Sequence, residues 1–245
     1  VGSGAMIGMR VMGTLALLLA ATPVLAQDAP AFLAGETMNC PECDLAGADL
    51  KGRDLSGVDL HGASLHGALL GKAKLDGADL SGANLNRADF KGASLAGANL
   101  KGVLGYEADF SAAILTGADL SGARLQHSRF SQAKLEDAIM VDVDLKRSVM
   151  AGARLKDADL TRANLTGVDL QGANLTQAVL TDAGFVQASL IDAVLRHADA
   201  QRADLMSADL TRANLGGADL RGANMIHARI QFGDFRGTIL GALPE

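Results

Sequence analysis

Residues 43–62 read CDLAG, ADLKG, RDLSG and VDLHG, which are four units of five residues in one unbroken phase. Of the 40 residues at multiples of five from Leu45 to Leu240, 29 are Leu, five Phe, three Met and one Ile, and only Gly105 and Ala200 depart. The residue two places earlier is Ala in 30 units, and the residue between is Asp or Asn in 22. So regular a tandem repeat predicts a solenoid in which each unit packs on its neighbours.

The five-residue period matches neither an α-helix nor a simple strand. If each unit forms one short extended segment and one turn, four units close a square and each coil takes 20 residues. Phe90, Phe110 and Phe130 are spaced by 20 residues, and Met150 continues the line. We therefore expect these four side chains to stack in one interior column.

The last place of each unit is mostly Gly up to Gly122 and often charged or polar after it, as at Arg162. Glycine allows turns with positive φ at no steric cost, so we expect different turn types in the two halves. Gly105 removes a core side chain from the middle of the array. We expect Leu104 or Tyr106 to swing inward and fill that space.

The chain resembles the pentapeptide-repeat family, and the motif stands as ADLKG at 48–52, ANLNR at 83–87 and ADLRG at 218–222. The resemblance covers residues 43–242. It implies an all-β fold, a right-handed quadrilateral β-helix of about ten 20-residue coils. In that family the Leu and the Ala two places before it point inward, and the other three positions point outward.

The first 26 residues have the pattern of a secretory signal peptide. Arg10 is followed by an apolar run over 11–19, and small residues lead to Ala26. The run is too short to span a bilayer comfortably, so we expect cleavage near Ala26, no membrane span afterwards, and a periplasmic or secreted protein. Residues 27–42 are expected to form an N-terminal cap or linker, and residues 243–245 a C-terminal tail.

Both ends of a solenoid need covering, because open strand edges pair with other chains. Phe32 and Leu33 are predicted to cover the first coil. Arg53 stands at an inward place in that coil, from which it can reach solvent or the cap. Phe232, Gly233 and Phe235 disturb the last units and are predicted to form a hydrophobic plug at the far end.

Cys40 and Cys43 form the only reactive-looking motif, Cys-Pro-Glu-Cys. In an exported protein such a pair predicts a structural disulfide. Reduced structural thiols are an alternative, and a redox pair or half of a zinc site is another. The sequence lacks a second Cys pair and a nearby His for a zinc site, so no metal and no cofactor is expected.

Every fourth unit places acidic residues on one side of the predicted coil. This acidic stripe could bind cations or a basic partner, or could be a solvated face inherited from the repeat. Its uniform environment offers no separation of pKa values for paired catalytic carboxylates, so no catalytic residue is predicted. The stripe consists of Asp59, Asp79, Asp119, Asp159, Asp199 and Asp219.

Val186, Met206 and Ile226 are 20 residues apart at the first place after the core residue, and Ile191 lies on the next side. These residues should form an exposed apolar column, which is typical of a contact site. We expect a homodimer through the C-terminal coils, although a tolerant surface would show the same residues.

The favoured function is a non-enzymatic exported scaffold or binding protein whose partner is an unknown protein or envelope component. A net charge of −6 and a pI near 5.3 count against a nucleic-acid partner. Some members of the family imitate duplex DNA, bind gyrase and give quinolone resistance. That alternative requires the cytoplasm, and a Cys-based redox or metal protein is the second alternative.

Overall fold

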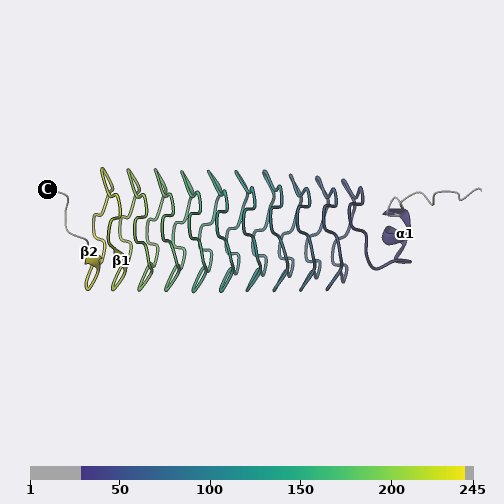
Figure 1. The fold of residues 1–245 in the computed structure, drawn as a ribbon, viewed down its shortest axis with the longest axis horizontal. Coiled ribbons are helices and arrows are strands. Elements are labelled where there is room, and N and C mark those ends of the chain that lie inside the picture. Colours follow the sequence, from purple (N-terminus) through teal and green to yellow (C-terminus); the bar gives the residue numbers. More distant parts are fainter. Residues whose placement is uncertain (1–28, 241–245) are drawn as a thin grey trace, which may run out of the picture.

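The structure is a computed structural model that describes residues 29–240. The predicted signal peptide, its cleavage point and the predicted C-terminal tail lie outside the described residues. The repeat winds into one long rod, with α1 (Ala29–Ala34) at one end. Two short strands, β1 (Asp219–Leu220) and β2 (Ile239–Leu240), lie at the opposite end (Figure 1).

Parallel β-bridges between successive coils define the architecture. Every bridge joins residues 20 positions apart, from Asp44 with Ser64 onward, and the β1–β2 pair follows the same register, Asp219 with Ile239. One coil therefore takes four units, which confirms the 20-residue coil. The strands stay very short because a turn interrupts the chain in every unit.

A β-turn closes each unit. In the unit around Leu60, the Ala63 N–H donates to the Leu60 carbonyl at 3.1 Å, with His61 and Gly62 between them. The Gly62 position is in the left-handed conformation, as a type II turn requires of its third residue. The Gly62 N–H donates to the Ser81 carbonyl of the next coil at 2.8 Å, so a hydrogen bond joins each corner to the corner of the next coil.

The corner conformation does not depend on residue type. We call the last residue of each unit, the third residue of the turn, the corner residue. At all 40 corner residues from Glu42 to Gly237, φ is positive, between 56° and 73°. The expectation of different turns in the two halves is therefore wrong. Coil-to-coil hydrogen bonds fix the backbone even where the residue is not Gly, at the cost of steric strain around Cβ.

The interior is a continuous column of Leu and Ala, nearly all without solvent exposure. The expected Phe column is confirmed: the rings of Phe90 and Phe110 stack at 4.8 Å between centroids, and those of Phe110 and Phe130 at 4.9 Å. Met150 is fully buried one coil further on. Offset stacking of such rings adds to the energy of burial.

The gap at Gly105 is filled from the next coil and not by its own neighbours. A Cβ at Gly105 would lie 2.6 Å from Cδ2 of Leu125, so Leu125 occupies the space. Leu104 and Tyr106 are about two-fifths exposed, and the expectation that either turns inward is wrong. An inward turn would break the alternation that points both residues away from the core.

The two ends of the described rod differ. Phe32 of α1 is buried against the first coil, which confirms it as part of a cap, whereas Leu33 is exposed. At the other end Phe235 is only half-buried, and Phe232 is 88% exposed. The expectation that Phe232 plugs the last coil is wrong, because it occupies an outward corner position with φ of 61°.

Adjacent alanines offer a test of the corner. Ala112 is exposed with φ of 57°, and Ala113 is fully buried. We expect Ala112→Gly to raise the free energy of unfolding by about 0.5–1 kcal/mol, because Gly adopts positive φ without Cβ strain. Ala113→Gly should lower it by about 1–2 kcal/mol through lost burial and added chain entropy. Denaturant titration measures both, and shifts of the same sign would contradict this account of the corner.

Candidate functional site

The Asp or Asn before each core residue has a structural task. Its side-chain Oδ1 accepts the backbone N–H two residues later, as when Asp169 accepts from Gln171 at 3.0 Å. All 22 Asp and Asn residues at this place, from Asp44 to Asp234, make this bond. Such Asx turns satisfy the N–H of the first corner residue, which no other backbone bond uses. The regular Asp is thus explained by the turn.

The acidic stripe lies in one column, as the bridges that connect Asp59 to Asp79 and Asp199 to Asp219 indicate. Asn99 continues the column, while Ile139 and Val179 interrupt it. The stripe as a whole comprises Asp59, Asp79, Asp119, Asp159, Asp199 and Asp219, and every one of these carboxylates accepts its own turn N–H.

Several carboxylates of the stripe are also paired with cations. Asp119 lies 3.0 Å from Lys101 Nζ, and Asp219 binds the Arg221 guanidinium with both oxygens. That guanidinium holds the pKa of Asp219 below its usual value. The stripe therefore presents less free negative charge than its sequence indicates.

Ion pairs along the corners were missed by the sequence reasoning. Arg162 binds Asp142 with two hydrogen bonds of 2.7 and 2.6 Å, and each partner stands at the corner position of successive coils. Comparable pairs join Arg202 to Asp182 and Arg212 to Asp192. These hydrogen bonds lower the pKa of the three carboxyls. Comparing corner residues 20 apart would have revealed all of these pairs.

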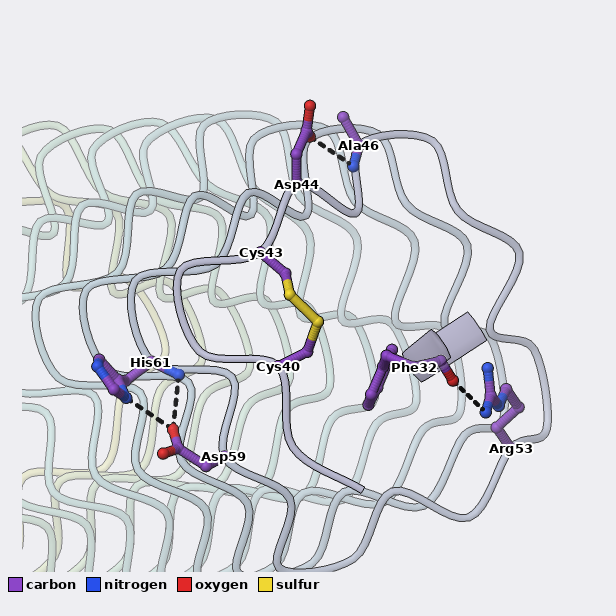
Figure 2. The surroundings of a disulfide bond; sticks show 8 residues. All are labelled: Phe32, Cys40, Cys43, Asp44, Ala46, Arg53, Asp59 and His61. Atoms are coloured by element: carbon purple, nitrogen blue, oxygen red, sulfur yellow. Dashed lines mark hydrogen bonds and ion pairs between the residues drawn. A yellow bond between two sulfur atoms is a disulfide. The ribbon is translucent and has the colours of Figure 1, made fainter. Parts of the chain in front are cut away.

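Cys40 and Cys43 meet beneath the helical cap (Figure 2). The structure joins their sulfur atoms in a disulfide, and both residues are buried. They occupy the places that hold Leu and the following Ala in ordinary units. The Cys40 N–H donates to the Asp59 carbonyl at 2.9 Å, so the coil hydrogen bonding already begins at Cys40.

Arg53 ties the cap to the first coil, also visible in Figure 2. Its guanidinium donates to the carbonyls of Phe32 and Leu33 at 3.1 and 3.3 Å and lies 5.4 Å from the Phe32 ring centroid. The guanidinium therefore contacts the cap, the second of the two expected positions. In the same coil, His61 Nδ1 lies 2.7 Å from Asp59 Oδ1, and this hydrogen bond raises the pKa of His61.

Neither a metal site nor a membrane helix is found between residues 29 and 240. Within that range no three His, Cys, Asp or Glu side chains gather so that they could hold a metal ion. No helix in the same range combines the length and apolar character needed to cross a bilayer.

The apolar column is only partly exposed. Ile226 is 59% and Met206 37% exposed, whereas Val186 and Ile191 are half-buried. Ile230 and Leu240 are exposed for a different reason, since they stand at inward positions of the last coil, on which no further coil packs within the described residues.

The chain belongs to the pentapeptide-repeat family. The family model described as pentapeptide repeats (8 copies) matches residues 43–82, 63–102, 106–141, 138–177, 173–212 and 203–241. Membership implies the right-handed β-helix of that family. A comparison with curated proteins finds no match.

Solved structures of similar proteins include HetL from the cyanobacterium Nostoc sp. strain PCC 7120, a pentapeptide repeat protein involved in heterocyst differentiation regulation. HetL is 30% identical over 83% of this chain and 90% of its own, with a TM-score of 0.39. A trypsin-treated form of QnrB1, a plasmid-mediated fluoroquinolone resistance protein, is 20% identical over 79% and 90%, with a TM-score of 0.36. A pentapeptide repeat protein from the Arabidopsis thaliana thylakoid lumen is 23% identical over 62% and 71%, with a TM-score of 0.20.

Asp169 provides a test of the turn bond, because its Oδ1 accepts from the Gln171 N–H. We expect Asp169→Ala to lower the free energy of unfolding by about 1 kcal/mol, since the turn N–H loses its acceptor. Asp169→Asn keeps the oxygen and should cost less than about 0.3 kcal/mol. Denaturant titration measures the free energy of unfolding of both variants. If Asp169→Ala and Asp169→Asn lost the same amount, the carboxylate charge and not the turn hydrogen bond would be responsible.

Proposed function

We propose that this protein is an exported, non-enzymatic scaffold that binds its partner through outward side chains on a rigid rod. The proposal rests on the different burial of the inward and outward positions within each unit. The two inward positions are packed almost without exposure, and the outward positions align in columns with a 20-residue spacing. Such columns present side chains at a spacing close to that of strands, about 4.8 Å.

Rigidity supports this role. In a typical unit the N–H groups of Leu100, Gly102 and Asn99 all donate to carbonyls of neighbouring coils, at 2.7, 3.0 and 2.9 Å. We infer a quadrilateral coil that repeats about ten times over residues 43–242, because four units complete each 20-residue turn. A surface fixed in this way loses little conformational entropy on binding.

Export is the second part of the proposal. The signal-peptide pattern over residues 1–26 supports it, and so does the close approach of Cys40 and Cys43. Disulfides persist in oxidising compartments outside the cytoplasm. A structural disulfide here would hold the cap on the first coil, where an ordinary unit has only a Leu–Ala contact.

The alternatives have less support. Imitation of DNA requires an extended run of free negative charge, and Lys101, Arg221 and the turn N–H groups compensate much of the stripe. Redox chemistry requires an accessible thiol, and both Cys residues are buried below Phe32.

A homodimer is the first partner that we propose. Met206 and Ile226 are exposed at the same outward place in successive coils, and Val186 stands one coil before them. Apolar surface of this continuity is typical of a protein contact. A second copy would cover it by placing the same column against its own.

The proposed export can be tested by intact mass spectrometry on protein from fractionated cells that express the full gene. We expect a chain that begins at Gln27, lies outside the cytoplasm and lacks the two hydrogen atoms that a disulfide removes. A Cys40→Ser, Cys43→Ser variant should be exported equally and show no such loss. An uncleaved, reduced chain in the cytoplasm would contradict the proposal and make gyrase inhibition the next assay.

The proposed dimer can be tested by light scattering on the purified protein. Met206→Asp should reduce the particle mass to that of one chain, because a carboxylate cannot be desolvated in an apolar contact. Thr116→Asp is the matched control, since Thr116 occupies the same place in its unit on another face. An unchanged particle mass in Met206→Asp would exclude the column as the interface.

A further inference from the structure

One corner of the rod lacks side chains at both turn positions. Gly216 and Gly217 form the only unit of the repeat in which both are Gly. The same corner carries Arg196 and His197 in the coil before and Arg236 in the coil after. Since coils lie about 4.8 Å apart, the two arginines flank a gap about one side chain wide.

The gap is a hollow of about 490 Å³, lined by these five residues together with Asn214, Asp234 and Gly237. This volume is typical of sites for small molecules. A Cβ at Gly217 would lie 2.5 Å from His197 Nδ1, so the imidazole lies directly over the Gly217 backbone. A side chain at position 217 would displace that ring, which links the second Gly to the shape of the hollow.

The two arginines differ in their hydrogen-bonded ion pairs. Arg236 donates to both oxygens of Asp234, at 2.8 and 2.7 Å, and this interaction lowers the pKa of Asp234 to about 2. Arg221, at the same place in another unit, binds its own Asp219 likewise. A cation at this place is compensated in these two units by the Asp two residues earlier, and in others by an Asp of the next coil, as Lys101 is by Asp119.

Arg196 has no Asp two residues earlier. The residue two places earlier is Val194, and the next coil offers Asn214, a neutral amide, at the equivalent place. Arg196 forms no ion pair within residues 29–240. Asp234 attracts Arg196 at longer range, because Arg196 also contributes to the lowered pKa of that carboxyl. Two arginines therefore share one carboxylate, and the hollow keeps a net positive charge.

Hydrogen-bond donors face the same space. Asn214 uses its Oδ1 to accept the Gly216 N–H at 3.0 Å, and its amide nitrogen donates to no residue in the described range. Together with the Arg196 guanidinium and the His197 ring, the lining can offer donors from three side chains. A guanidinium suits phosphate and carboxylate groups because its fork of N–H groups binds two oxygens at once.

We propose that this hollow binds a small organic anion through a phosphate or carboxylate group held by Arg196 over the Gly216–Gly217 backbone. Asn214 and His197 complete the donor set, and Arg236 closes the far side while it remains bound to Asp234. The site is independent of the apolar column and of the Cys pair, so the proposal stands apart from the scaffold function.

The test is calorimetric titration of the full chain at constant ionic strength with glucose 6-phosphate, inorganic phosphate, acetate and neutral glucose. We expect saturable binding of glucose 6-phosphate and no binding of glucose. Binding of inorganic phosphate without acetate identifies phosphate as the recognised group, and the reverse identifies carboxylate. No saturable binding of any anionic probe would overturn the proposal.

Two variants locate the site. Arg196→Gln should weaken binding at least about tenfold, since a charge-assisted hydrogen bond is lost. Gly216→Gln should also abolish binding, because it fills the hollow; φ at Gly216 is not positive, so the backbone accepts a side chain. Arg221→Gln is the matched control, and thermal unfolding verifies that each variant is folded. Equal weakening by Arg196→Gln and Arg221→Gln would mean nonspecific attraction by surface charge and would exclude the site.

Discussion

A left-handed backbone at every fifth residue is the constraint on which the rest of this rod depends. Each such residue turns the chain through one corner, so that the next two inward positions again meet the core. Non-Gly residues accept this conformation because the corner is bonded on both sides. His127, for example, has φ of 59° and donates to the Lys146 carbonyl of the next coil at 3.0 Å. A single corner in another conformation would rotate every later unit relative to those before it.

The side chain before each core residue reinforces the corner from within the unit. Its oxygen binds the one corner N–H that the coil-to-coil bonds leave unused. Where that residue is Ile139 or Val179, the turn keeps the same geometry without this bond. The backbone pattern is therefore the cause of the coil, and the Asp or Asn side chain is a local addition to its stability.

The sequence predicts the inward half of the structure well, because burial imposes a strict period on Leu and Ala. The Phe90, Phe110 and Phe130 column follows from the 20-residue spacing alone. Details of side-chain packing do not follow from this spacing. The repeat indicates that Gly105 leaves a gap, but packing decides that Leu125 fills it. Likewise Phe232, as a large apolar residue, is expected to close the end of the interior, but its place in the repeat puts it at an exposed corner.

Outward features are harder to predict, because the repeat tolerates almost any side chain there. The contact of Arg53 with the cap required knowing where α1 lies. The hollow beside Arg196 required comparing three successive coils at one corner. Its signal, the doubled Gly at 216 and 217, is visible in the sequence, but its meaning depends on which residues stand 20 places before and after it.

The turn hydrogen bond tolerates exchange between Asn and Asp at its acceptor, whether by deamidation or by mutation. The corner N–H needs an oxygen acceptor and is indifferent to whether an amide or a carboxylate supplies it, as Asn164 and Asp159 show. Deamidation of an Asn at this place to ordinary Asp therefore changes the net charge and keeps the acceptor. Six of the 22 acceptors are Asn, so their complete deamidation would take the net charge from −6 to −12 and leave every turn acceptor in place. Asn99, Asn164 and Asn224 would each lose the hydrogen bond that their amide donates to an Asp of the coil before.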